Sequence, residues 1–436
     1  MDAVTVIGGG LAGVEAAWAL ANRGIQVTLF EMKGEKFSPA HHSTDLAELV
    51  CSNSLKAQRL NSAAGMLKEE MRLLGSVCMK AALQCAVPAG GALAVDRDRF
   101  SALVTSYIEG HDNITVVRRE VTEIPQGPVI IAAGPLASEA ISKKIQDLCG
   151  NALSFFDAAA PIVTKESLDA DCYFTQSRYD RGGEDDYLNC PMNKAEYEAF
   201  YDALIHAESA ELHSFDKRKD VYEGCMPIEV MASRGKDTIR YGPLKPVGLR
   251  DPRTGHRPWA VLQLRRENAE GSMLNLVGFQ TNLKFQEQKR VFSMIPALKH
   301  AEFVRYGVMH RNTFLDAPRC LQGDFSLKTH PYIFFAGQIT GVEGYMESAA
   351  AGIMAGINLL RRINGKETLI FPPETMIGSL ARYISDPSVK NFQPMGANFG
   401  MLPPIEPKIR EKQMRYQALS DRGLALLRTI IEKEGL

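Results

Sequence analysis

The chain has 436 residues, of which 45% are hydrophobic and 23% are charged. These proportions are typical of folded globular proteins, so they exclude a disordered, collagenous or coiled-coil chain, and the length allows two or three domains. Fifty Lys and Arg residues nearly balance 51 Asp and Glu residues, so any contact with nucleic acid must depend on local basic patches.

The sequence also bears on cellular location and on metal binding. It has no apolar run long enough for a membrane span and no basic leader at its N-terminus, so we expect a cytoplasmic protein without a membrane partner. Its eight cysteines contain no C-x-x-C pair. This pattern predicts reduced thiols and no metal site.

The N-terminal segment has the pattern of a dinucleotide-binding motif. Residues 3–7 predict a buried strand, residues 11–23 predict a helix, and a G-x-G-x-x-G turn joins them; an ordinary glycine turn of an α/β protein is the alternative. Such a turn lets the backbone approach a pyrophosphate at the helix N-terminus. A second strand, residues 26–30, ends at an acid that can bind the ribose hydroxyls of adenosine. The predicted cofactor contacts here are Gly8, Gly9, Gly10, Leu11, Ala12, Gly13 and Glu31.

Two later strands end in glycine, as strands near the dinucleotide do in FAD domains. Residues 128–133 lead to Gly134, and residues 332–336 lead to Gly337. A helix rich in Ala and Gly follows at 348–360, and we expect its N-terminus at the pyrimidine edge of a flavin. No second G-x-G-x-x-G follows a strand, so NADPH or NADH would dock transiently at the flavin. The turn before the helix supplies the further cofactor candidates Gln338, Gly341, Glu343, Gly344 and Tyr345.

Acidic and basic residues are concentrated in different segments in the middle of the chain. If the early and late strands share one sheet, the residues between them form an insertion. Residues 166–213 hold twelve acids and three bases, whereas residues 234–266 hold nine bases and two acids. This basic stretch is either ordinary solvated surface or a face that follows the phosphates of a nucleic acid. The predicted RNA contacts are Arg234, Lys236, Arg240, Lys245, Lys289, Arg290 and Arg311.

Two cysteines lie in segments of the kind that carry chemistry. Cys51 lies among small polar residues, and Cys225 lies in a loop bounded by Gly and Pro. A cysteine is more often a small buried hydrophobe than a nucleophile, so both readings stay open from the residues alone. The residues by themselves indicate an FAD oxidoreductase with candidate thiols.

Longer motifs carry a resemblance that covers nearly the whole chain. It resembles the folate- and FAD-dependent tRNA uracil-5-methyltransferases, the TrmFO family. The stretches that carry the resemblance are residues 8–13, 39–42, 48–55, 87–97, 187–192, 223–249, 306–314, 335–349 and 391–395.

The resemblance implies a reaction and roles for several residues. The family makes 5-methyluridine in the T loop of tRNA, with 5,10-methylenetetrahydrofolate as carbon donor and FAD reduced by NADPH or NADH. Uracil C5 becomes nucleophilic when a thiolate adds at C6, a role that the motif assigns to Cys225. The motif assigns removal of the C5 proton to Cys51, either as the base itself or as the residue that positions a water. His310 is expected to stack the pterin of the folate, and Glu343 and Tyr345 are expected near the flavin ring.

The expected fold is α/β, with a Rossmann-like FAD-binding domain of the glutathione-reductase type and an inserted α+β domain. We expect the FAD domain at 1–165 and 320–436, the insertion at 166–319, RNA in the cleft between them, and no obligate protein partner. Three rivals remain: the same chemistry on ribosomal RNA, a GidA-like flavoprotein that modifies wobble uridine, and a nonenzymatic RNA-binding flavoprotein. The GidA-like reading is less expected, because the chain ends at Leu436 without that group's long helical C-terminal region.

Overall fold

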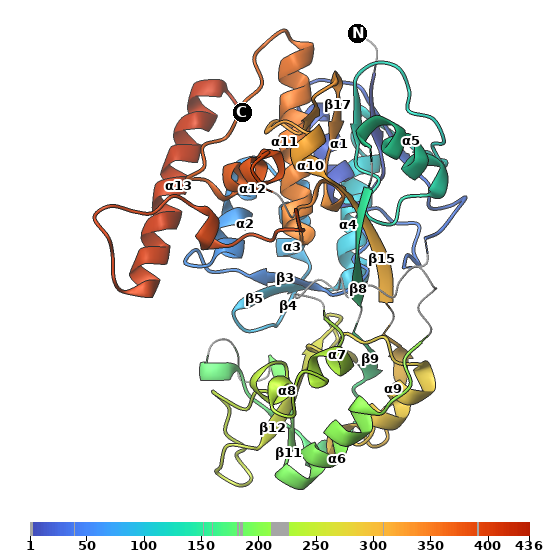
Figure 1. The fold of residues 1–436 in the computed structure, drawn as a ribbon, viewed down its shortest axis with the longest axis vertical. Coiled ribbons are helices and arrows are strands. Elements are labelled where there is room, and N and C mark those ends of the chain that lie inside the picture. The colour runs from blue at the N-terminus through green and yellow to red at the C-terminus, as the bar shows by residue number, and fades with distance from the viewer. Residues whose placement is uncertain are drawn as a thin grey trace.

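A computed structural model of the chain describes residues 3–38, 40–150, 152–158, 160–180, 183, 186–210, 226–307, 309–389 and 392–436. Two sheets, each with its own hydrophobic core, organise these residues. In Figure 1 the first sheet and its helices form the upper body, which contains both chain ends, and the second sheet forms the lower body. We call them the first domain and the inserted domain. The predicted boundaries at 165/166 and 319/320 stay a proposal.

The first sheet has six strands in the order β16-β17-β7-β1-β2-β6, and all its pairings are parallel except that of β16 with β17. The late strand β17 therefore pairs with β7 beside the early strand β1, which confirms the predicted α/β, Rossmann-like fold. The central strands β1 and β7 are short and almost wholly buried, as parallel strands between helices usually are. Their bounds are β1 (Val4–Ile7), β2 (Val27–Glu31), β6 (Ile114–Arg118), β7 (Val129–Ile131), β16 (Ser326–Leu327) and β17 (His330–Phe335).

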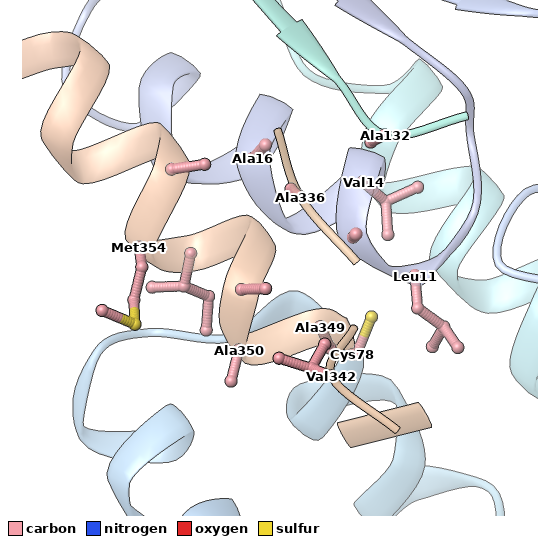
Figure 2. Close-up of a cluster of buried hydrophobic side chains, with 14 of the residues drawn as sticks. Leu11, Val14, Ala16, Cys78, Ala132, Ala336, Val342, Ala349, Ala350 and Met354 are labelled. Atoms are coloured by element: carbon pink, nitrogen blue, oxygen red, sulfur yellow. The ribbon is translucent and has the colours of Figure 1, made fainter. Parts of the chain in front are cut away.

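Helices α1 (Leu11–Ala21) and α11 (Tyr345–Ile363) pack directly against each other beside this sheet. Small residues on both helices allow the close approach: Figure 2 shows Ala16 on α1, and a Cβ atom on Gly356 of α11 would lie 2.9 Å from the Ala16 carbonyl oxygen. A Cβ atom on Gly352 of α11 would lie 2.1 Å from the Ala12 carbonyl oxygen, so only glycine fits there. The other helices of this domain are α2 (Ala63–Leu73), α3 (Val77–Gln84), α4 (Arg97–Glu109), α5 (Glu139–Cys149), α10 (Ala317–Cys320), α12 (Met376–Ser385) and α13 (Lys412–Glu434).

The second sheet is antiparallel, with the order β10-β11-β12-β13-β9-β14. Helices accompany it in the described ranges, so the inserted domain is of the α+β type. Its strands are β9 (Ile162–Thr164), β10 (Phe174–Thr175), β11 (Tyr187–Met192), β12 (Ala260–Arg266), β13 (Met273–Leu276) and β14 (Phe303–Arg305). Its helices are α6 (Lys194–Ile205), α7 (Ile228–Ala232), α8 (Thr238–Tyr241) and α9 (Phe285–Phe292).

Two small sheets lie where the domains meet (Figure 1). The antiparallel ribbon of β8 (Ala152–Ala158) and β15 (Met309–Leu315) carries the chain into and out of the inserted domain. The second small sheet has the order β3-β5-β4 and belongs to the first domain. Its strands are β3 (Ser54–Ala57), β4 (Ala86–Val87) and β5 (Ala92–Val95), and the segment that carries Cys51 leads directly into β3.

Candidate active site

A large pocket opens at the carboxyl ends of the parallel strands of the first sheet, where ligands of such sheets usually bind. Its empty space, counted together with the open solvent at its mouth, is about 1070 Å³. Nine of the fourteen predicted cofactor residues line it: Gly8, Gly10, Leu11, Ala12, Glu31, Gly134, Gly337, Gln338 and Tyr345. The other five, Gly9, Gly13, Gly341, Glu343 and Gly344, lie outside the lining.

Steric contacts explain why the turn between β1 and α1 is rich in glycine. Gly8 has a φ of +102°, and a Cβ atom there would lie 2.4 Å from the carbonyl oxygen of Ala132. A Cβ atom on Gly13 would lie 1.7 Å from the carbonyl oxygen of Gly8. A Cβ atom on Gly10 would instead meet nothing within 4 Å, because Gly10 borders the open pocket. Gly10 begins α1 without a side-chain cap, so the first N–H groups of the helix are available to an anion.

Glu31 is held at the end of β2 by two backbone donors. The amide of Gly9 donates to its Oε2 at 2.7 Å, and the amide of Lys33 donates to its Oε1 at 2.9 Å. Sequence reasoning missed three pocket residues beside it, Lys33, His41 and Glu48, although two of them lie in the motif stretches 39–42 and 48–55. Lys33 and Glu48 form an ion pair of 3.3 Å. Burial, followed by the charge of Lys33, lowers the pKa of His41.

The turn before α11 is shaped by residues that we predicted near a flavin. The Gln338 side-chain amide donates to Glu343 Oε2 at 2.8 Å, so a buried carboxylate orients this amide. Gly341 and Gly344 have φ values of +87° and +126°, which only glycine adopts easily. In the first turn of α11, Glu347 accepts a hydrogen bond of 2.7 Å from Lys56.

The Cys51 thiol lies at the Tyr345 end of the pocket. The Tyr345 hydroxyl oxygen accepts hydrogen bonds from the Cys51 amide at 2.8 Å and from the Ser52 amide at 3.2 Å, and it lies 3.0 Å from Cys51 Sγ. Burial, followed by the Cys51 sulfur, raises the pKa of Tyr345 well above its ordinary value. The phenol therefore keeps its proton near neutral pH and can donate it to the sulfur.

Three arginines hold the rest of the Cys51 segment. Arg97 Nη1 donates to the Leu49 carbonyl at 2.5 Å, and Arg305 Nη2 donates to the Val50 carbonyl at 2.5 Å. Arg265 donates to Ser52 Oγ and to Asn53 Oδ1, both at 3.1 Å. Arg305 and Arg265 come from the inserted domain, so both domains position this segment.

Arg97 also forms an ion pair with a residue of the inserted domain. Its Nε donates to Glu267 Oε1 at 2.6 Å, and the two side chains are 11% and 4% exposed. Although burial disfavours the charged guanidinium, Glu267, Tyr345 and Cys51 together raise the pKa of Arg97. Burial lowers the pKa of Arg305. Sequence reasoning gave these arginines no catalytic role, although Arg97 ends the motif stretch 87–97.

The remaining predicted site residues are placed as follows. Cys225 lies outside the described residues. His310 and Arg311 lie on β15, opposite Asp157 and Phe156 of β8, but their side chains are not among the described parts. Of the predicted RNA contacts, five are exposed: Arg234, Lys236, Lys245, Lys289 and Arg290.

Arg240 and Arg290 already have partners within the inserted domain. The Arg240 guanidinium lies 3.8 Å from the centre of the Trp259 ring and donates to the Trp259 carbonyl at 3.0 Å. Arg290 forms a two-point contact with Glu287 at 2.6 and 2.8 Å. Lys236 is exposed but forms an ion pair of 2.9 Å with Glu198.

Two searches of the described ranges found nothing. No helix among them combines the length and apolar character needed to cross a bilayer. Within the same part of the chain, no group of three or more His, Cys, Asp or Glu side chains is arranged to hold a metal ion.

Comparison with known proteins gives concordant matches. Residues 3–367 match the family described as glucose inhibited division protein A. A methylenetetrahydrofolate–tRNA-(uracil-5-)-methyltransferase TrmFO of Acetivibrio thermocellus is 58% identical over 435 residues, which is 99% of each chain. The protein of the same name from Desulforamulus reducens is 59% identical over 99% of this chain and 98% of its own length. Among solved structures, Aquifex aeolicus GidA matches with a TM-score of 0.69 and 18% identity, over 99% of this chain and 76% of that chain, a likeness of fold.

Proposed function

This chain belongs to the glucose inhibited division protein A family and to the methylenetetrahydrofolate–tRNA-(uracil-5-)-methyltransferases, and we propose that it makes 5-methyluridine in the T loop of tRNA. The carbon donor is 5,10-methylenetetrahydrofolate. The observation that carries the proposal is that Tyr345 both lines the dinucleotide pocket and contacts Cys51, so a reactive thiol lies at the end of a cofactor site.

The described residues fit FAD as the cofactor. The open space at Gly10, the uncapped start of α1 and the oriented carboxylate of Glu31 suit a pyrophosphate and a ribose. Gln338 and the turn at 341–344 suit the ribityl chain and the flavin ring. Reduced by NADPH or NADH, the bound flavin would supply the hydride that completes the methyl group.

The chain's own residues supply the acid–base and nucleophilic steps. Cys225 is the proposed nucleophile, whose thiolate adds to uracil C6 and makes C5 electron-rich. C5 then bonds the carbon supplied by methylenetetrahydrofolate, whose bond to the donor nitrogen breaks. Cys51 removes the proton that remains on C5, and Cys225 leaves C6. The Tyr345 hydroxyl accepts hydrogen bonds from the Cys51 and Ser52 amides and lies 3.0 Å from the Cys51 sulfur, so it orients the proposed base. Arg97 and Arg305 fix the backbone on the N-terminal side of Cys51.

The RNA would reach the site across the face of the inserted domain. The target uridine must leave its stack, because C5 and C6 are inaccessible within it. The exposed cations Arg234, Lys245 and Lys289 are the proposed phosphate contacts, whereas Arg240 and Arg290 have structural partners. His310 is the proposed pterin contact. A cytoplasmic location is part of the same proposal, because tRNA is used there.

Transfer of label from methylenetetrahydrofolate to RNA tests the function. Purified protein with NADPH or NADH is offered undermodified tRNA or ribosomal RNA fragments, with S-adenosylmethionine as donor in a parallel reaction. We expect label in 5-methyluridine of the tRNA T loop and only with folate. Label in ribosomal RNA alone would keep the chemistry and change the substrate.

Cysteine variants test the assigned roles in the same assay. Cys225→Ala and Cys51→Ala should each abolish methylation, and Cys172→Ala, which changes a thiol of the inserted domain, should leave it intact. A Cys225→Ala protein that methylates at the wild-type rate would remove the assigned nucleophile.

A further inference from the structure

Three aromatic rings form a stack on the inserted domain that the reaction described above does not use. Tyr306 lies between the other two: its ring centre is 4.9 Å from that of Phe285, with an interplanar angle of 15°, and 5.4 Å from that of Phe303, with an angle of 6°. We call Phe285, Tyr306 and Phe303 the ring stack. The side chain of Phe285, at the end of the stack, is 54% exposed.

The ring stack is rigidly supported. Buried Gln288 of α9 exchanges two hydrogen bonds with the backbone of Gly307: its Oε1 accepts from the Gly307 amide at 2.8 Å, and its Nε2 donates to the Gly307 carbonyl at 2.8 Å. This exchange locks α9, which begins at Phe285, to the strand segment that carries Phe303 and Tyr306. The exposed ring is therefore a fixed flat surface, and not a mobile side chain.

The location of the ring stack ties it to the Cys51 segment. Arg305, between the stacked residues Phe303 and Tyr306 in the chain, donates to the Val50 carbonyl directly before Cys51. The described residues on both sides of Cys225 also attach beside Phe285. The Ala210 amide donates to the Asn282 carbonyl at 2.8 Å, and the Ile228 amide donates to the Gln280 carbonyl at 2.7 Å.

The charges around the exposed ring favour a polyanion that carries flat rings. Lys284 and Lys289 flank Phe285 on the same helix and are exposed; Lys284 pairs with Glu208, and Arg290 pairs with Glu287. Nucleic-acid bases unstacked from a loop commonly bind to such exposed aromatic rings, while neighbouring cations contact the phosphates. An apolar peptide would not need the cations.

We propose that the exposed face of Phe285, supported by Tyr306 and Phe303, is a stacking platform for an unpaired base of the RNA loop that presents the target uracil. This inference rests on the proposed function, since it assumes an RNA substrate. The platform would hold the neighbouring nucleotide while the target base enters the site between the two cysteine segments.

Direct tRNA binding by the full-length, FAD-loaded protein tests the platform. Stacking of one base on an aromatic ring predicts that Phe285→Ala raises the Kd for undermodified tRNA by about 5- to 100-fold, while Phe285→Trp keeps it near the wild-type value. The matched control is Tyr332→Ala, which removes a 46% exposed ring from β17 of the first domain and should leave the Kd unchanged. Equal thermal unfolding and flavin content show that each variant is folded.

Salt dependence separates stacking from charge. Phe285→Ala should leave the slope of log Kd against log salt unchanged, because a ring releases no counterions, whereas Lys289→Gln should make the slope shallower by about 0.7. A wild-type Kd for Phe285→Ala would overturn the platform, as would a raised KM for methylenetetrahydrofolate with unchanged tRNA binding. Failure of the wild-type protein to methylate tRNA would instead count against the proposed function, and the two failures are therefore distinguishable.

Discussion

The ion pair between Arg97 and Glu267 should lock the two domains together around Cys51. Its N–O distances are 2.5 and 2.6 Å, and both side chains are nearly buried. Glu267→Gln leaves the guanidinium of Arg97 buried without its counter-charge. Removing one partner of a buried pair typically costs about 3–5 kcal/mol, so we expect the interface between the domains to weaken by that order.

The two tryptophans of the chain allow each domain to be followed separately. Trp18 packs against the core of the first domain, and Trp259 packs against the core of the inserted domain. In Trp18→Phe and Trp259→Phe backgrounds, urea unfolding followed by fluorescence reports one domain each. We expect the two transitions to lie close together in the parent protein and to separate in Glu267→Gln. Alkylation of Cys51 by iodoacetamide should become faster in this variant, because a weaker interface exposes the thiol.

Two comparisons make this prediction refutable. Arg97→Met combined with Glu267→Gln removes both charges and should recover much of the lost stability, since an apolar replacement of a buried pair is often neutral. Glu198→Gln, which breaks an exposed pair with Lys236 in the same domain, should change stability by less than about 1 kcal/mol. Unmoved transitions in Glu267→Gln, or a double variant as unstable as the sum of the singles, would refute the reasoning.

Three further predictions concern the pocket, the Cys51 segment and pH. Gly13→Ala should lower the yield of folded protein, because its Cβ would lie 1.7 Å from the Gly8 carbonyl oxygen. Gly10→Ala should fold normally and lose only FAD affinity, which is measured by flavin absorbance after gel filtration. Tyr345→Phe should slow methylation by about 5- to 100-fold and leave the Kd for tRNA unchanged, because the Cys51 and Ser52 amides lose their hydrogen-bond acceptor. Methylation at the wild-type rate would contradict this role. Burial raises the pKa of Glu70 to about 8, so its contribution to stability is present below its unfolded pKa near 4.5 and is lost as pH rises toward 8. The midpoint of urea unfolding should therefore fall over that pH range in the wild type and fall less in Glu70→Gln. An equal fall of the midpoint with pH in both proteins would refute this.

The cofactor pocket was predictable because its signals are local. The β1–α1 turn, the acid at the end of β2 and the glycines after β7 and β17 each lie within a few residues of a recognisable strand. Parallel pairing then brings these strand ends to one edge of a sheet.

The surroundings of Cys51 were not predictable in this way. Arg97, Arg265 and Arg305 are distant from Cys51 in sequence, and only the docking of the inserted domain brings two of them to it. The charge count also treated the bases of 234–266 alike, although Arg265 is buried and Arg240 lies against Trp259. A count of charges reports composition, and it carries no information about which side chains fold inward.

The β8–β15 ribbon has a consequence for how the molecule could have been assembled. Ala158 and Met309 are directly paired at the far end of the ribbon, so the polypeptide enters and leaves the inserted domain at neighbouring points. A segment whose ends meet can be gained, lost or exchanged without altering the strand order of the sheet from which it emerges. The ribbon is thus a single connection at which a nucleotide-binding domain could gain an inserted domain in one step.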